Sequence, residues 1–131
     1  RLSGRAFKTM GLAFDYVLSS PKQRSKQTAG LVAEELGFPV REIIETDKVK
    51  AKAPPEETFQ VLADLPDAQG VLIVGHQPSV GEVASYLLTE GSKAMIQFEP
   101  GGCCCIEVDE LPTHSGRLLW FLIPKVLEIL M

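Results

Sequence analysis

The chain has 131 residues, a length that fits one domain. Its 13 basic and 17 acidic residues give a net charge of −4, so no global positive field draws it to nucleic acid. The most apolar stretch, residues 118–131, is interrupted by Pro124, Lys125 and Glu128 and is too broken to cross a bilayer. We therefore expect a single domain over residues 1–131, with neither a membrane nor a nucleic-acid partner.

Apolar spacing and turn residues divide the chain into alternating strands and helices. This order predicts an α/β domain in three layers, with a mixed, mostly parallel central sheet and helices on both faces. The predicted elements in chain order are a strand over 15–19, a helix from Ser20 to Gly37, a short strand over 41–45, a Lys- and Pro-rich loop over 48–55, a helix over 56–65, a strand over 71–74, a helix over 80–88, an irregular stretch over 89–100, strands over 103–108 and 118–122 with a turn between them, and a helix-like tail over 125–131.

Three of these boundaries depend on single residues. Gly4 and Gly11 leave little room for a stable helix before the first predicted strand. Ser20 suits the N-cap of the next helix and Pro21 its first position, while Gly37 suits its end. In the helix over 56–65, we expect the inward side chains to be Phe59, Leu62 and Ala63.

Two strand-to-helix junctions carry the residues best suited to ligand binding or catalysis. Gly75-His76-Gln77-Pro78 follows the apolar strand over 71–74, and Ser20 with Arg24 follows the strand over 15–19. Ligands of open α/β sheets bind outside the carboxyl ends of the strands, and a helix start offers free N–H groups to an anion. An arginine there offers a planar fork for two phosphate oxygens. Taken singly, however, Arg24 also fits a solvated surface charge, and His76 a structural or exposed histidine.

The same two junctions resemble signatures of a known family. Leu18-Ser19-Ser20-Pro21-x-x-Arg24-x-x-x-Thr28-Ala29 resembles the second signature of the histidine phosphatase, or phosphoglycerate mutase-like, superfamily, and Val74-Gly75-His76-Gln77-Pro78 resembles its late signature. The short length is most similar to the SixA-type phosphohistidine phosphatases. Residues 1–3 resemble a remnant of the segment that follows the family's first strand.

The resemblance implies a mechanism without metal or cofactor. In this family the histidine of an Arg-His-Gly motif attacks phosphorus and becomes phosphorylated, and water then releases the phosphate. By motif, Arg24 and His76 would be the second arginine and second histidine around the phosphate, with Ser20 and Arg1 as further phosphate ligands. Fixed cationic donors stabilise the charge that spreads over the equatorial oxygens in the transition state.

The chain departs from the family at its nucleophile. It contains no Arg-His-Gly, and its only other histidine, His114, lies in a predicted late turn. We therefore expect that the family's first strand is missing from these 131 residues, either because the sequence is part of a longer one or because the domain is catalytically inactive. The first explanation is favoured, since an α/β domain rarely drops a central strand and still folds.

The sequence thus favours a cytoplasmic phosphatase that hydrolyses phosphohistidine on a partner protein. The alternatives are a phosphate-binding pseudophosphatase module and a small-molecule phosphomonoesterase or mutase of the same fold. The sequence does not identify the acid that protonates the leaving group. Glu56 and Glu57 lie between the two motifs, but acidic residues there equally stabilise a helix N-terminus.

The run Cys103-Cys104-Cys105 suggests a metal-binding or redox function, but its spacing does not support one. Neighbouring side chains of a strand point to opposite faces, so three in a row cannot all ligate one ion, and zinc sites use spaced ligands. We expect strand packing with one exposed thiol. An odd, adjacent set of cysteines is also no disulfide framework, which favours a reducing cytoplasm.

Overall fold

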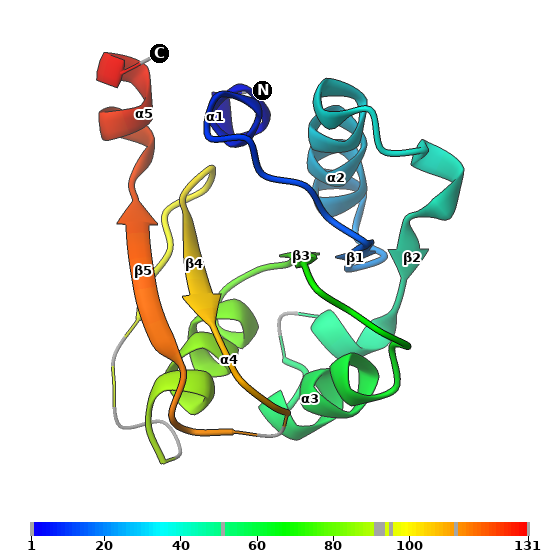
Figure 1. Ribbon diagram of the computed structural model, residues 1–131, viewed down its shortest axis with the longest axis vertical. Coiled ribbons are helices and arrows are strands. Elements are labelled where there is room, and N and C mark those ends of the chain that lie inside the picture. The colour runs from blue at the N-terminus through cyan, green and yellow to red at the C-terminus, as the bar shows by residue number, and fades with distance from the viewer. Residues whose placement is uncertain (1, 51, 91–93, 95, 112, 131) are drawn as a thin grey trace.

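The computed structural model describes residues 2–50, 52–90, 94, 96–111 and 113–130 (Figure 1). Helices and strands alternate through most of this part, and a hairpin and a short helix close it. The elements are α1 (Leu2–Thr9), β1 (Tyr16–Ser19), α2 (Gln23–Leu36), a 3-10 turn (Val40–Glu42), β2 (Ile44–Glu45), a second 3-10 turn (Asp47–Val49), α3 (Pro55–Ala63), β3 (Val71–Val74), α4 (Ser79–Leu88), β4 (Cys103–Glu107), β5 (Arg117–Leu122) and α5 (Pro124–Leu130).

The strands β1, β2 and β3 form a parallel sheet in the order β2-β1-β3. Ser19, the last residue of β1, is level with Glu45 of β2 on one side and with Val74 of β3 on the other. Val17 and Leu18 of the central strand are almost completely buried. The three strands therefore end together at one edge of the sheet.

The helices lie on both faces of this sheet, as predicted. In Figure 1, α1 and α2 lie on one side of the parallel strands, and α3 and α4 lie on the other. α1 packs against both α2 and α5, whereas α3 packs against α4. This arrangement is the three-layer α/β/α architecture expected from the sequence. No helix in the described ranges is long and apolar enough to cross a membrane.

The central sheet differs from the prediction in one respect, because the two late strands do not join it. β4 and β5 form a separate antiparallel hairpin, with an irregularity between Cys105 and Ile106. In the described part of the chain, β3 therefore pairs on only one edge and so does β4. Figure 1 shows β4 on the side of β3 opposite to β1. All four residues of β3 are apolar, yet each remains partly exposed.

The prediction that residues before Gly11 have no stable helix was wrong. α1 covers Leu2–Thr9 and buries Ala6 and Phe7. Gly4 assists this helix, because a Cβ there would lie 3.3 Å from the Cα of Val32 in α2. The glycine allows close approach of two helices, and this packing outweighs its poor helix propensity.

The predicted start of α2 was also wrong. Ser20 is not the N-cap; the helix begins at Gln23, after an extended Lys22. The backbone N–H of Ser20 donates to the carbonyl of Val74 at 3.0 Å, which keeps Ser20 attached to β3. Its hydroxyl accepts the N–H of Lys22 at 3.3 Å. The predicted end was correct, because Gly37 adopts a left-handed conformation with a φ of 74°.

Two smaller predictions need correction, one in α3 and one in the strand before it. Phe59 and Leu62 are buried as expected, but Ala63 is exposed and Thr58 is buried in its place. The Thr58 hydroxyl donates to the carbonyl of Lys48 at 2.7 Å, so a polar residue is satisfied inside. The predicted strand over 41–45 is shorter than expected, because a 3-10 turn occupies its first two residues and β2 covers only Ile44–Glu45.

Candidate functional site

The site begins with the shared edge at which the parallel strands end. Ser20 and Val74 are joined by a backbone hydrogen bond, and the N–H of Thr46 donates to the carbonyl of Ser19 at 3.0 Å. The chain leaves all three strands at this level. The segments that follow β1, β2 and β3 are therefore brought together, although they are far apart in the sequence.

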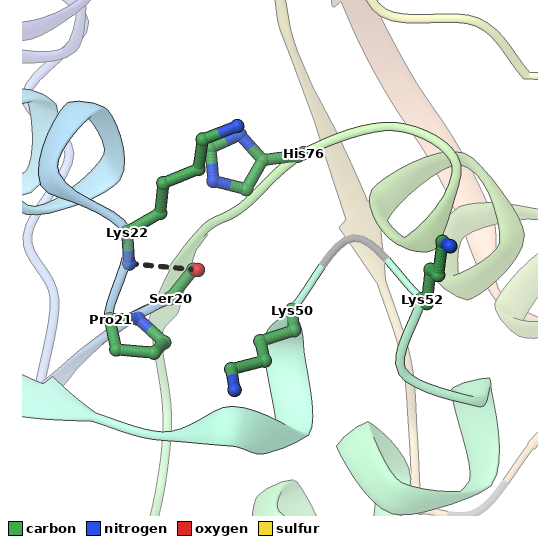
Figure 2. A pocket seen from close by; sticks show the side chains of 6 residues that line it. All are labelled: Ser20, Pro21, Lys22, Lys50, Lys52 and His76. Carbon is green, nitrogen blue, oxygen red and sulfur yellow. Dashed lines mark hydrogen bonds between the residues drawn. The ribbon is translucent and has the colours of Figure 1, made fainter.

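These segments surround a cavity of about 490 Å³. Ser20, Pro21 and Lys22 come from the β1–α2 connection, Lys50 and Lys52 from the segment after β2, and His76 from the β3–α4 connection. Figure 2 shows Lys22 reaching alongside His76, with Lys50 on the other side of Pro21 and Lys52 on the opposite wall. The cavity thus combines one imidazole and three ammonium groups.

His76 is held by a side chain from the neighbouring helix. Oγ of Ser25 lies 2.7 Å from Nε2 of the imidazole. Ser25 is 2% exposed and belongs to the first turn of α2. Because this serine is fixed by packing, its hydroxyl sets the direction of the ring. The imidazole itself is only partly buried and borders the cavity.

The environment of His76 favours its neutral form. Partial burial lowers its pKa most, and the positive charges of Lys22 and then Arg24 lower it further. A dianionic ligand in the cavity would reverse this effect, since it would stabilise the imidazolium. The site is therefore built so that a proton on His76 is most favourable when an anion is present.

The side chain of Gln77 fixes the loop that carries His76. Its side-chain amide donates to the carbonyl of Ile96 at 3.2 Å and accepts the N–H of Gly81 at 2.9 Å. A Cβ on Gly81 would lie 2.2 Å from the Ile96 carbonyl oxygen, so only glycine fits between these groups. The position of His76 at the cavity thus depends on a tight contact in the first turn of α4.

The structure brings together two of the four residues predicted for the site. His76 and Ser20 both line the cavity. Arg24 is exposed on the first turn of α2 and is not among the lining residues, but its charge reaches His76 closely enough to lower the pKa of that imidazole. Arg1 lies outside the described residues.

The remaining histidine and the candidate acids lie elsewhere. His114 bonds the carbonyl of Tyr86 near the carboxyl end of α4, whereas His76 precedes the start of that helix. Glu57 forms an ion pair with Lys48 at 3.3 Å, and Glu56 borders a smaller cavity of about 220 Å³ with Phe59. None of these groups lines the cavity at His76.

The three cysteines of β4 are free and half-buried. Burial raises the pKa of Cys103 to about 11 and that of Cys104 to about 12, so both thiols are protonated at neutral pH. This agrees with a packing role better than with a reactive one. No cluster of three or more potential metal ligands occurs among the residues that the structure describes.

Sequence reasoning missed four residues of the site. Ser25 directly follows Arg24 but carries no motif signal of its own. Lys22 lies in the predicted helix start, and Lys50 and Lys52 lie in the predicted Lys-rich loop. That loop composition was the available signal, but only the parallel pairing of β1 and β2 shows that the loop faces His76.

Comparison with known proteins gives matches of structure rather than of sequence. No protein-family profile matches the chain. No curated protein matches it by sequence either. The protein histidine phosphatase SixA complexed with tungstate superposes with a TM-score of 0.83 at 23% identity, covering 96% of this chain and 79% of that one.

Two further solved structures have the same fold. A protein assigned as phosphohistidine phosphatase SixA from Nakamurella multipartitia matches with a TM-score of 0.74 at 18% identity, over 93% of this chain and 77% of its own. Its counterpart from Agrobacterium tumefaciens gives 0.69 at 20% identity, over 94% and 76%. The chain therefore has the fold of the SixA-type histidine phosphatases.

Proposed function

We propose that this domain hydrolyses phosphohistidine on a partner protein, through a covalent phosphohistidine intermediate on the enzyme. The observation that carries this proposal is the cavity at the ends of the parallel strands, where His76 lies among cationic side chains. The fold is that of a protein named as a histidine phosphatase and solved with tungstate, an oxyanion similar in shape to phosphate. The two sequence signatures at Ser20–Arg24 and at His76 support the same activity.

In the proposed reaction the residues of this chain stabilise charge. The cations at the cavity would hold the phosphoryl oxygens, and His76 would donate a hydrogen bond once the anion has raised its pKa. Arg24 would turn its guanidinium from the first turn of α2 towards the same group. The imidazole leaving group of phosphohistidine needs less help from a strong acid than an alkoxide does. This fits the lining of the cavity, which includes no glutamate among the residues that the structure describes.

The nucleophile would come from an additional strand. β3 and β4 each have one edge without a partner strand among the described residues, and the apolar residues of β3 are only partly buried. We propose that an extended apolar segment, ending in Arg-His-Gly, pairs with β3 on this edge. If it ran parallel to β3, its carboxyl end would deliver the histidine beside His76. Residues 1–131 would then be one domain that lacks its first strand.

The test compares two N-terminal extensions of the chain that differ in one residue. One is an apolar strand ending in Arg-His-Gly and the other ends in Arg-Gln-Gly. With a phosphohistidine protein as substrate, we expect the first form to release phosphate and to carry an acid-labile, alkali-stable phosphoryl group. The second form should bind phosphate without turnover. If neither form releases phosphate, although both fold and bind the anion, the proposal of hydrolysis is wrong.

A second candidate function is a phosphate-binding module without turnover. It is favoured by one observation: among the described residues, His76 is the only histidine that lines the cavity. This candidate predicts that the natural full-length protein binds a phosphohistidine protein but leaves it phosphorylated. For either function we propose a cytoplasmic setting, on the basis of the three free cysteines.

A further inference from the structure

The cavity carries more positive charge than a single phosphoryl group would require. Its lining contains Lys22, Lys50 and Lys52 besides His76, and no acidic side chain from the described part of the chain. This concentration occurs in a chain whose net charge is −4. The volume of about 490 Å³ falls within the roughly 300–1,000 Å³ that is typical of whole ligand sites. The cavity thus has both the room and the charge for a second anionic group.

The three lysines that line the cavity differ from their neighbour Lys48 in their ion pairs. Lys48 belongs to the same loop as Lys50 and Lys52 but does not line the cavity, and it is paired with Glu57 at 3.3 Å. Among the described residues, Lys50 forms its one ion pair with the highly exposed Asp47, at 3.1 Å. No ion pair is found for Lys22 or Lys52 with any residue that the structure describes. Lys22 and Lys52 are therefore available to a ligand, and Lys50 is held only by a solvent-exposed ion pair, of a kind that contributes little and can be exchanged for a ligand carboxylate.

Their positions separate an inner from an outer part of the cavity. Lys22 lies beside His76, and its charge lowers the pKa of that imidazole more than the charge of Arg24 does. In Figure 2, Lys50 and Lys52 stand on the walls away from the imidazole, on the segment that follows β2. Lys22 therefore belongs with the phosphoryl group, while Lys50 and Lys52 face what surrounds it.

We infer that Lys50 and Lys52 form a second anion subsite, which recognises acidic side chains next to the phosphorylated histidine of the partner protein. The inference rests on the proposed function and names its substrate more closely: a phosphohistidine on an acidic protein surface. Exposed lysines are suited to this role, because they attract a flexible set of carboxylates without requiring one geometry. The attraction should weaken as ionic strength rises.

The experiment measures the affinity of the chain for two peptides that carry a non-hydrolysable phosphohistidine analogue. In one peptide the analogue is flanked by glutamates, and in the other by glutamines. At low salt we expect the glutamate peptide to bind about tenfold more tightly, and this preference should shrink at 0.5 M salt. The double variant Lys50→Glu/Lys52→Glu should lose the preference or reverse it.

A matched control separates a local subsite from the overall charge. The double variant Lys8→Glu/Lys125→Glu changes the net charge by the same amount at two exposed positions on α1 and α5. It should keep the preference for the glutamate peptide. If the control loses the preference as fully as the cavity variant does, the selectivity comes from net charge and the inference is wrong.

The same experiment distinguishes failure of the inference from failure of the proposed function. Equal affinity of the unchanged chain for both peptides, combined with phosphate binding that His76→Ala abolishes, overturns the subsite but leaves the phosphate site standing. If the unchanged chain binds no phosphate, or if His76→Ala leaves phosphate binding unaltered, both the subsite and the proposed function are wrong. If a small bisphosphate displaces the glutamate peptide at far lower concentration than the peptide itself binds, the second anion belongs to a small molecule, and the proposed protein substrate is wrong.

Discussion

The hydroxyl oxygen of Ser25 lies 2.7 Å from Nε2 of His76, so a residue of α2 holds the imidazole that follows β3. This contact joins two strand-to-helix junctions that are 51 positions apart in the chain. It also occupies one of the two ring nitrogens of His76. The orientation in which this imidazole meets a ligand is therefore set by a buried serine.

Removing that hydroxyl should loosen the ring. In Ser25→Ala, Nε2 loses its protein partner, and we expect phosphate affinity to fall by roughly 2- to 13-fold, equivalent to about 0.5–1.5 kcal/mol for one hydrogen bond. Calorimetric titration with phosphate, together with the NMR signals of the His76 side chain, measures both effects. Ser115→Ala, at an exposed position, is the control. Unchanged affinity and unchanged His76 signals would show that Ser25 does not position the ring.

Stability should depend on pH through His76. Since the folded state lowers the pKa of this imidazole below 6.5, the unfolded state takes up a proton first as the pH falls. The free energy of unfolding should therefore decrease as the pH drops through 6.5 and below. Urea denaturation at pH 7.5 and at pH 5.5 measures this slope. It should flatten in His76→Gln and persist in His114→Gln, which leaves the His76 imidazole in place; a slope that His76→Gln does not change would contradict the assignment.

Arg24 provides a direct test of the phosphate site. Arg24→Ala should weaken the binding of phosphate or vanadate by about 1.5–3 kcal/mol, the range for a hydrogen bond to a charged group. Arg41→Ala, which removes another exposed arginine from the 3-10 turn before β2, should leave the affinity unchanged. If Arg24→Ala behaves like Arg41→Ala, then Arg24 is a surface charge and its assignment to the site is wrong.

Two glycines in helices should respond oppositely to alanine. In Gly81→Ala the new methyl group would meet the carbonyl of Ile96, and overpacking of this kind costs about 1–3 kcal/mol. In Gly30→Ala the methyl group would have no neighbour within 4 Å, and the better helix propensity should add about 0.5–1 kcal/mol. Thermal unfolding of both variants measures the difference. Equal changes in the two would contradict the tight contact at Gly81.

Much of the architecture could be predicted because its signals are local. The apolar run at Val71–Val74 and the end of α2 at Gly37 depend on neighbouring residues, and both predictions were confirmed. The start of α2 was missed, since the backbone bond that ties Ser20 to Val74 joins distant segments. The helix α1 was missed for a similar reason, because Gly4 is favourable only against a packed α2.

The site was less predictable than the fold. Motif spacing singled out His76 and Arg24, because each lies at a predicted strand-to-helix junction within a recognisable signature. Lys50 and Lys52 are ordinary in sequence and gain their role only when β2 pairs with β1 and turns the following loop towards His76. Long-range pairing of this kind leaves no periodic signal in the sequence.

The half-paired state of β3 has a consequence for amide exchange. Alternate N–H groups of this strand point towards β1, and the others point to the edge without a partner strand in the described ranges. Deuterium should therefore enter Val71–Val74 in an alternating pattern, fast at one residue and slow at the next. A segment that pairs with the open edge would protect the fast positions and make the pattern uniform. Amide exchange would therefore detect this pairing without an enzymatic assay.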